Sequence, residues 1–474
     1  MPRILPETSN QIPRFTVETE RSGLAIAMAM TLPHQKTRSE ATLSVADIFK
    51  TFLDNLKVDN AEQISLRYGE ITASLNKKFR DYESKENNSL QVGSYGRFTG
   101  IKGISDLDML YIMPKTRWDT YKNGKQSQLL TDTKDAIKAR YPKTDVRVDR
   151  LVVTITYSDF HIEVQPVFEE TDEDGNSYFN YPDTYNGGSW KTTKPRQEMT
   201  AIKELNEEKN NNLRLLCKMA RAWRNKHGVV MGGLLIDTLA YNFMKSTNDF
   251  DDKSFLYFNW LSRDFFKYLS EQPDQEHYKA PGSHQNVKVK KKFQKNAKKA
   301  YDLCLKAIDA EKTDSVNDKW KKVYGRSFPA KQITEEAAAK IEKSWRDTEQ
   351  FIEDIHPVDI RYQITLDCDV SQNGFRENTL AYMLMKRIPL LANKKLVFRI
   401  VECDVPEPYT LKWKVLNRGP VAQRRDCIRG QIVWDEGYNR KKESTNFQGE
   451  HFVECYAIKN GIVVALASID VPIQ

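Results

Sequence analysis

The sequence lacks the features that mark secreted proteins, membrane proteins and dedicated nucleic-acid binders. Only six of its 474 residues are cysteines, and they form no CxxC pair or other zinc-like spacing. No stretch reaches the roughly 18 to 20 apolar residues of a transmembrane helix, and the short apolar run at residues 23–32 has flanks of mixed charge that do not suit a signal peptide. The net charge of +8 is modest for this length, so a phosphate-rich partner is allowed but not indicated. We therefore expect reduced thiols in a cytoplasmic protein with no membrane partner.

The first 42 residues also lack a regular pattern. They contain four prolines and no apolar periodicity, which predicts a disordered leader over residues 1–42. Met28 and Met30 leave open that the natural start lies at one of them. From Ser44 onward apolar side chains recur every three or four residues, which predicts helices over about 45–56 and 61–82.

A mixed region follows these helices. Alternating apolar residues at 106–112, 151–157 and 160–168 predict strands. Residues 170–195 are rich in acidic residues, aromatics and glycine, and we expect them to form a long loop. Helical spacing then dominates from residue 197 to residue 330.

The last part of the chain changes to a period of two. After a charged helical segment there are six or seven short alternating strands in about 115 residues, a pattern typical of a β-sandwich. The fold class predicted is therefore α+β, with an all-β C-terminal domain. The predicted parts are a leader at 1–42, a core with a helical lobe at 43–330, a helical linker at 331–354 and a β-sandwich at 355–474.

Two carboxylates stand one residue apart at the start of the first predicted strand. Asp106 and Asp108 share a face of that strand, because alternate side chains in β-structure point the same way. At about 7 Å apart, two such carboxylates can jointly hold one or two divalent cations of the Mg²⁺ type, which usually bring substrate phosphates with them. A lone pair of this kind is more often just solvated, so its interpretation depends on its surroundings.

Those surroundings favour phosphoryl-transfer chemistry. Gly93 and Ser94 precede the pair in a small-residue turn, whose backbone N–H groups and hydroxyl can face a triphosphate. Glu163 lies in mid-strand on a polar face shared with His161 and Gln165, and it adds a third carboxylate. Electrostatic stabilisation supplies most of the catalysis in phosphoryl transfer, and this set of groups can provide it.

Together these parts resemble the polymerase-β-like nucleotidyltransferases. Their pattern hG[GS]-x(9–13)-[DE]h[DE]h is matched by Gly93-Ser94, eleven intervening residues and Asp106-Leu107-Asp108. Within that group, residues 44–330 resemble the bacterial cGAS/DncV-like nucleotidyltransferases with SMODS-type cores. The closer resemblance rests on the segments GSYGRFTGIKGISDLDMLYIMP and HIEVQP.

This resemblance implies a cyclic oligonucleotide synthase. Such enzymes join nucleoside triphosphates through their sugar hydroxyls, release pyrophosphate and close a cyclic di- or trinucleotide, a messenger in bacterial anti-phage signalling. Two Mg²⁺ or Mn²⁺ ions are implied as cofactors. The implied site residues are Asp106, Asp108 and Glu163 for metal binding and catalysis, and Gly93, Ser94 and Lys218 for nucleotide binding.

The chain departs from the family pattern at two places. Glu163 stands where the family more often has aspartate, and both residues offer carboxylate oxygens to a metal. The family also has a phosphate-binding serine about fifteen residues after the lysine that matches Lys218, and here that place is taken by Gly232 or Gly233. The contacts to the triphosphate are therefore left open.

The last 120 residues resemble a second family, the adenylyl/guanylyl and SMODS C-terminal sensor domain. The resemblance rests on YTLKWKVLNRG at 409–419 and GEHFVECYAIKNG at 449–461. It implies a regulatory ligand, whose identity these residues do not give. Trp413, Trp434 and His451 can line a pocket, although aromatics at alternate strand positions are more often core residues.

Other interpretations stay open. The same catalytic residues would serve a nucleotidyltransferase that makes linear oligonucleotides or extends RNA. An inactive nucleotide sensor, a protein of another class, would keep the fold without turnover. The lysine-rich run at 288–299 can bind an activating nucleic acid or form a solvated helix face, and we favour the second.

Overall fold

The computed structural model of the protein describes five segments of the chain, which are residues 44–103, 106–158, 160–330, 348–417 and 420–474. The leader predicted at 1–42 and most of the predicted helical linker lie outside these segments. The end of that linker is described, and it contains the short 3₁₀ turn η4 (Ile352–Asp354) and no α-helix. No helix in the described segments is long and apolar enough to cross a membrane. All six cysteines are free thiols, and four of them are buried.

The two helices that begin the described chain are those the apolar spacing predicts, α1 (Val45–Asn55) and α2 (Ala61–Arg80). Ser44 caps α1, because its hydroxyl accepts the Asp47 N–H at 3.2 Å while the Asp47 carboxylate accepts the Ser44 N–H at 3.1 Å. Burial follows the apolar stripe, so that Phe49 on α1 is fully enclosed.

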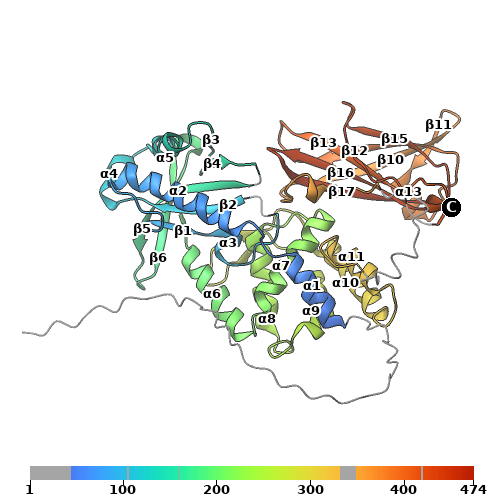
Figure 1. The fold of residues 1–474 in the computed structure, drawn as a ribbon, viewed down its shortest axis with the longest axis horizontal. Coiled ribbons are helices and arrows are strands. Elements are labelled where there is room, and N and C mark those ends of the chain that lie inside the picture. Colours follow the sequence, from blue (N-terminus) through green and yellow to red (C-terminus); the bar gives the residue numbers. More distant parts are fainter. Residues whose placement is uncertain (1–43, 104–105, 159, 331–347, 418–419) are drawn as a thin grey trace, which may run out of the picture. The chain divides into compact units, whose positions relative to one another are not determined.

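A seven-stranded sheet forms the centre of the first half of the chain (Figure 1). Its main path runs β1-β2-β5-β4-β3, and β6 extends it by pairing with β5 and β7. The β2–β5 pair is parallel, whereas the other pairs of this sheet are antiparallel. The strands are β1 (Ser89–Gln91), β2 (Asp106–Ile112), β3 (Asp145–Val148), β4 (Val153–Thr156), β5 (His161–Thr171), β6 (Ser177–Asp183) and β7 (Ser189–Thr193).

The prediction of a long loop at residues 170–195 is wrong, because the two strands β6 and β7 lie within that segment. Phe179 explains the difference, since it is completely buried in a small apolar cluster with Val167 of β5. The polar composition of this segment obscures its pairing with β5, in which Phe168 lies opposite Asn180.

Helices cover the sheet and then form a separate lobe. The buried residues of α2 and α5 (Gln126–Arg140) share one core with β2, β4 and β5, which includes Leu75, Leu129 and Val164. The helical lobe has its own, larger core, to which α1 also contributes. Besides α1, the lobe contains α6 (Pro195–Glu208), α7 (Asn212–His227), α8 (Gly233–Ser246), α9 (Phe258–Ser270), α10 (Gln294–Asp309) and α11 (Val316–Tyr324).

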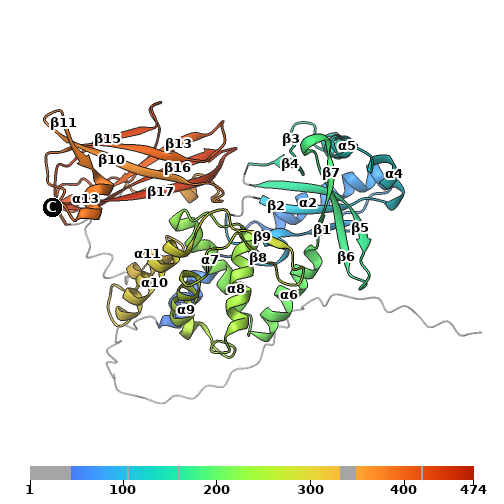
Figure 2. The ribbon, with the colours of Figure 1, turned by 180° about the vertical axis from the view of Figure 1, so that it is seen from behind.

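One part of the lobe differs from the helical spacing that dominates residues 197–330 of the sequence. A short hairpin, β8 (His277–Lys279) and β9 (Asn286–Lys288), lies there instead, and α10 begins only at Gln294 (Figure 2). Gly282 has φ of +70° in the connection between these strands, a backbone conformation that suits a tight turn and not a helix.

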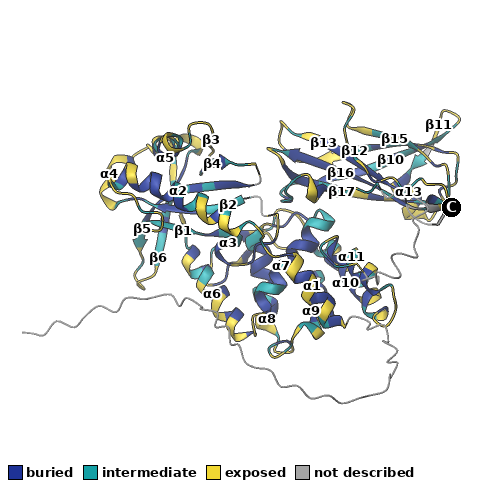
Figure 3. Ribbon diagram, in the orientation of Figure 1, coloured by how far each residue is buried: buried dark blue, intermediate teal, exposed yellow. Residues whose placement is uncertain are grey.

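The C-terminal region is a sandwich of two four-stranded sheets, β11-β10-β12-β15 and β14-β13-β16-β17. A single apolar core between them includes Phe398 from one sheet and Trp413 from the other. Figure 3 shows the buried residues along β16 and β17 of this region. The strands are β10 (Ile364–Gln372), β11 (Phe375–Thr379), β12 (Lys395–Cys403), β13 (Thr410–Leu416), β14 (Ile432–Trp434), β15 (Arg440–Ser444), β16 (Gly449–Lys459) and β17 (Ile462–Ile473).

The predicted fold class is confirmed, since a mixed region of sheet and helices is followed by an antiparallel sandwich. The all-β description of the second region needs a small correction, because it also contains the short helices α13 (Leu380–Lys386) and α14 (Pro420–Arg424). The predicted boundaries at residues 330 and 354 stay predictions.

Candidate active site

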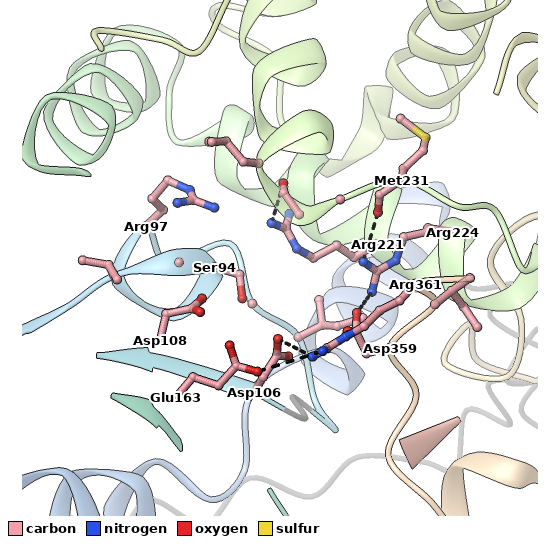
Figure 4. Close-up of a pocket in the computed structure, with 18 of the residues that line it drawn as sticks. Ser94, Arg97, Asp106, Asp108, Glu163, Arg221, Arg224, Met231, Asp359 and Arg361 are labelled. Atoms are coloured by element: carbon pink, nitrogen blue, oxygen red, sulfur yellow. Dashed lines mark hydrogen bonds and ion pairs between the residues drawn. The ribbon is translucent and has the colours of Figure 1, made fainter. Parts of the chain in front are cut away.

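The parallel pairing of β2 with β5 brings the three predicted acids onto one face of the sheet. In this register Asp106 lies opposite His161, and Asp108 lies opposite Glu163. Side chains two residues apart on a strand share a face, so the three carboxylates converge there (Figure 4). The sequence places Asp106 and Asp108 together by their spacing, but only the strand pairing adds Glu163.

The turn before β2 packs directly against one of these acids. Gly93 opens the single-turn helix α3 (Gly93–Gly96) with φ of +64°. A Cβ atom at this position would lie 1.8 Å from Oδ2 of Asp108, so any side chain would collide with the carboxylate. The Val92 N–H also donates to the Asp108 carbonyl at 3.0 Å. Position 93 therefore requires glycine both for its backbone conformation and for the close approach to Asp108.

These groups border a cavity of about 550 Å³. Its walls come from the sheet, the glycine turn, the helical lobe and the segment before β10. The polar residues that line it include Ser94, Arg97, Asp106, Asp108, Glu163, Gln165, Glu198, Arg221, Arg224, Asn225, Lys290, Asp359 and Arg361. A cavity of this size with a few convergent charges is typical of a small-molecule site.

The acids repel one another in this partly enclosed place. Burial, followed by the charges of Asp106 and Glu163, raises the pKa of Asp108 to about 7. Burial and the charge of Asp106 also raise the pKa of Glu163. A cation would relieve this repulsion, so the electrostatics of the face favour positive charge.

A positive charge from the distant C-terminal region already contacts the acids. Nη2 of Arg361 donates to Oδ2 of Asp106 at 2.8 Å, and Nη1 of Arg361 lies 3.9 Å from Oε1 of Glu163. Figure 4 shows its guanidinium group between these acids and Asp359. The sequence pattern gives no sign of this contact, because Arg361 lies more than 190 residues beyond Glu163 in the chain.

The donor set fits divalent cations in its chemistry, since Mg²⁺ and Mn²⁺ prefer oxygen ligands and the face offers three carboxylates. Within the described part of the chain, however, no three Asp, Glu, His or Cys side chains are placed to hold one metal ion. Arg361 lies beside these carboxylates instead, with its guanidinium group on the carboxylate oxygen of Asp106 and near that of Glu163.

A buried ion network holds the glycine turn against the helical lobe. Asp237 of α8 accepts from Nε of Arg97 at 2.9 Å, from Nη1 of Arg221 at 2.6 Å and from the Thr99 hydroxyl at 3.0 Å. The two arginines keep the pKa of Asp237 well below its usual range, despite complete burial. Sequence reasoning missed this network, although a lone aspartate inside the apolar run GLLIDTLAYNF was a signal of a buried, paired charge.

The predicted nucleotide-binding residues fall into two groups. Gly93 and Ser94 line the cavity, but Lys218 does not. Lys218 is half-buried on α7, where burial and the charges of nearby Lys57 and Arg214 lower its pKa. The α7 cations that do line the cavity are Arg221 and Arg224, and each of them is already paired with a carboxylate.

The remaining candidates are structural or peripheral. Trp413 is buried in the sandwich, and its Nε1 donates to Asp435 at 2.8 Å. His451 is also buried, so neither residue is a pocket surface. Trp434 is 57% exposed and borders a second cavity of about 260 Å³.

Two family profiles match the chain. Residues 43–206 match the Second Messenger Oligonucleotide or Dinucleotide Synthetase (SMODS) domain. Residues 346–474 match the Adenylyl/Guanylyl and SMODS C-terminal sensor domain. Both resemblances found in the sequence are therefore confirmed.

Individual relatives are more distant. A Bacillus cereus (strain VD146) protein named "Probable cyclic nucleotide synthase" is 22% identical over 290 residues, which cover 52% of this chain and 84% of that protein. The structure of E. coli MS115-1 CdnC with ATP is 16% identical, covers 60% of this chain and 98% of its own, and has a TM-score of 0.42. The Vibrio cholerae DncV cyclic AMP-GMP synthase is 14% identical, covers 60% of this chain and 87% of its own, and has a TM-score of 0.42.

Proposed function

We propose that the chain, which combines a SMODS domain with the adenylyl/guanylyl and SMODS C-terminal sensor domain, is a cGAS/DncV-like nucleotidyltransferase that condenses nucleoside triphosphates into a cyclic di- or trinucleotide. The observation that supports this most directly is the face of three acids, Asp106, Asp108 and Glu163, beside the Gly93 turn in one cavity. Pyrophosphate is the other product.

Each acid has a place in this mechanism. Asp106, Asp108 and Glu163 would hold two Mg²⁺ or Mn²⁺ ions, which when bound neutralise phosphate charge and orient in-line attack on the α-phosphate. Glu163 lies opposite Asp108 and has a raised pKa, so it is suited to draw the proton from the attacking sugar hydroxyl. The carboxylates are fixed by the β2–β5 pairing, so little reorganisation is needed from the sheet.

The donor nucleotide is bound by the glycine turn in this proposal. The backbone of Gly93 and the hydroxyl of Ser94 face the cavity and would contact the triphosphate. Lys218 is proposed as a further phosphate ligand on the family pattern alone, because it does not line the cavity. Gly232 and Gly233 line the opposite wall without any side chain, which leaves room for the nucleotide.

The wider role follows the same family. We propose a cytoplasmic enzyme of bacterial anti-phage signalling whose product activates a separate effector. Nucleoside triphosphates are its substrates, and the C-terminal domain takes a regulatory ligand. The lysine-rich run at 288–299 has no role in this proposal, although Lys290 of this run lines the cavity.

The test is product analysis with paired variants. The protein is incubated with labelled nucleoside triphosphates and Mg²⁺ or Mn²⁺, and products that resist phosphatase are identified by mass. Glu163→Gln should lower turnover at least about a hundredfold, since a carboxylate that both binds metal and moves a proton is lost. Glu169→Gln is the matched control on the same strand, because Glu169 only pairs with Arg196 outside the cavity at 3.5 Å and should leave turnover unchanged.

The outcome also separates the rival functions. Phosphatase-sensitive products that lose their terminal phosphates would indicate linear oligonucleotides or tailed RNA. Arg361→Ala is included because it removes the guanidinium group that contacts Asp106. Absence of any turnover in both the wild type and this variant, with either metal, would support an inactive nucleotide sensor. Equal activity of Glu163→Gln and wild type would contradict the site assignment.

A further inference from the structure

Arg361 belongs to the C-terminal sensor region but ends in the candidate active site. It lies in the segment that leads into β10, within the residues that match the sensor domain. Its Nη2 reaches Oδ2 of Asp106 at 2.8 Å, and its Nη1 lies 3.9 Å from Glu163. The charge of Arg361 is thus placed on two of the three proposed metal ligands.

The side chain is held there by a second pair of charges. Nε of Arg361 donates to Oδ2 of Asp359 at 2.5 Å. Asp359 in turn lies 3.2 Å from Nη2 of the buried Arg224 on α7. Each end of the Arg361 guanidinium group therefore has a carboxylate, and its orientation toward Asp106 is fixed from both sides.

The backbone of this segment is attached to the sandwich. The N–H groups of Asp359 and Arg361 donate to the carbonyls of Val463 and Val464 on β17 at 3.0 and 2.9 Å. The Val463 N–H donates back to Pro357 at 2.9 Å. A shift of β17 would therefore move Arg361 with it.

The sandwich is itself docked on the helical lobe. An apolar cluster joins Val230, just after α7, to residues of the sensor region, and we call it the lobe–sensor cluster. Its members are Val230, Ile352, Ile360, Tyr456, Ile458 and Val463. Lys226 of α7 also lies 3.5 Å from the buried Glu454 of β16. Ile360, the neighbour of Arg361 in the chain, belongs to this cluster. The docking of the sandwich therefore also fixes the position of Arg361.

The chemistry of this arrangement opposes metal binding. A divalent cation would compete with Arg361 for Oδ2 of Asp106, and the guanidinium group 3.9 Å from Oε1 of Glu163 adds a repelling charge. A single guanidinium group offers only N–H donors, so it cannot take the place of the ion in catalysis. The state described here therefore disfavours any step that needs the metal.

We propose that the C-terminal sensor domain inhibits the active site by placing Arg361 on Asp106 and Glu163, in the position that a divalent cation must occupy. This inference rests on the proposed function, because it takes these acids as metal ligands. Activation then requires that Arg361 leaves the acids.

The experiment measures Mn²⁺ binding to the full-length protein without nucleotide, by the electron paramagnetic resonance signal of free Mn²⁺. Arg361→Ala should bind Mn²⁺ about tenfold to a hundredfold more tightly than wild type, as expected when charge-assisted hydrogen bonds to the ligands are removed. Arg361→Gln, which keeps the length of the side chain, should change affinity in the same direction. The same two variants should also show increased turnover of nucleoside triphosphates.

The matched control is Arg399→Ala. Arg399 is also a sensor-region arginine with a side chain 34% exposed, and it pairs with Asp369 at 3.3 Å, away from the cavity. It should bind Mn²⁺ as wild type does. Thermal unfolding of all variants establishes that each is folded before its affinity is compared.

A third variant separates this inference from the proposed function. In the Arg361→Ala background, Asp106→Asn should abolish the gain in Mn²⁺ affinity, because that gain is at this site. If Arg361→Ala leaves Mn²⁺ affinity unchanged, or lowers turnover as a substrate ligand would, inhibition by Arg361 is overturned while the proposed function stands. If Asp106→Asn alters neither Mn²⁺ binding nor turnover in any background, the proposed function itself fails.

Discussion

At the scale of single residues, the site depends on close contacts that tolerate few substitutions. Gly93 shows this most clearly, since its backbone lies where the Asp108 carboxylate leaves no room for a Cβ atom. The same closeness buries Asp108 and places it among like charges, and both effects raise its pKa.

We expect Asp108 to lower the stability of the fold in a pH-dependent way when no metal is present. Its pKa is raised from 3.8 to about 7 in the folded chain, so the protonated carboxyl stabilises the fold below about pH 4. That contribution is lost as the pH rises through about 7. In EDTA, Asp108→Asn should gain about 2–4 °C in unfolding midpoint relative to wild type between about pH 5 and about pH 8.

The control for this measurement is Asp135→Asn. Asp135 lies on α5 with its side chain 60% exposed beside Lys134. The difference in unfolding midpoint between Asp135→Asn and wild type should therefore not change with pH. If the difference in unfolding midpoint between Asp108→Asn and wild type were also independent of pH, the role assigned to burial and to the charged neighbours of Asp108 would be contradicted.

The residue pattern predicts much of the site, and its limits are physical. Asp106 and Asp108 are fixed by strand alternation, and the glycine turn by its spacing from them. Arg361 could not be predicted, because a contact between residues 255 positions apart depends on how two regions dock and leaves no local pattern. For Lys218 the family pattern gives a position on α7, but which side of the helix faces the cavity depends on tertiary packing.

At the scale of elements, the glycine turn is positioned by helices that follow it by more than a hundred residues. Asp237 joins Arg97 of the turn region to Arg221 of α7, and all three side chains are at least 95% buried. Without the carboxylate, two buried arginines would lose their partner. Removing one member of such a network is far more costly than breaking a surface pair.

Asp237→Asn should therefore destabilise the protein by about 3 kcal/mol or more. We expect the midpoint of thermal unfolding to fall by about 5 °C or more, with turnover reduced because the turn is no longer held against α7 and α8. Asp302→Asn is the control, since Asp302 pairs with Lys298 at 2.6 Å on the exposed side of α10 and should cost less than about 1 kcal/mol. Similar midpoints for the two variants would contradict the proposed role of the network.

The sequence predicts elements well where one periodicity extends over several turns. Helices α1 and α2 begin and end within about two residues of the apolar stripes that predict them. The strands β6 and β8 could not be found in this way, because they are short and polar and are stabilised by the strands beside them.

At the scale of the whole described unit, the helical lobe and the sensor region meet at a position that has no space for a side chain. Gly228 ends α7 with φ of +60°, and an added Cβ atom would lie 2.2 Å from the Leu466 carbonyl oxygen of β17. The docking of the sandwich, and through it the position of Arg361, therefore depends on this glycine.

Gly228→Ala should weaken that docking. The variant should bind Mn²⁺ more tightly than wild type, in the same direction as Arg361→Ala but by a smaller factor of about threefold to tenfold, since Arg361 is loosened and not removed. Mn²⁺ titration of the full-length variant measures it. Gly124→Ala is the control, because Gly124 has φ of +67° with open space around it and bears the same backbone strain without the contact. Equal Mn²⁺ affinity of the two variants would show that the Arg361 contact does not depend on docking at Gly228.

The contact between Arg361 and Asp106 also determines how inhibition depends on the amount of protein. An inhibitory group in the same chain acts at a fixed effective concentration, which is set by the fold and not by the solution. Dilution should therefore not activate the enzyme, and mixing with other copies should not silence an active variant. Excess divalent cation, or a ligand that moves β17, would shift this equilibrium, so the midpoint of the metal titration reports how firmly the sandwich is docked.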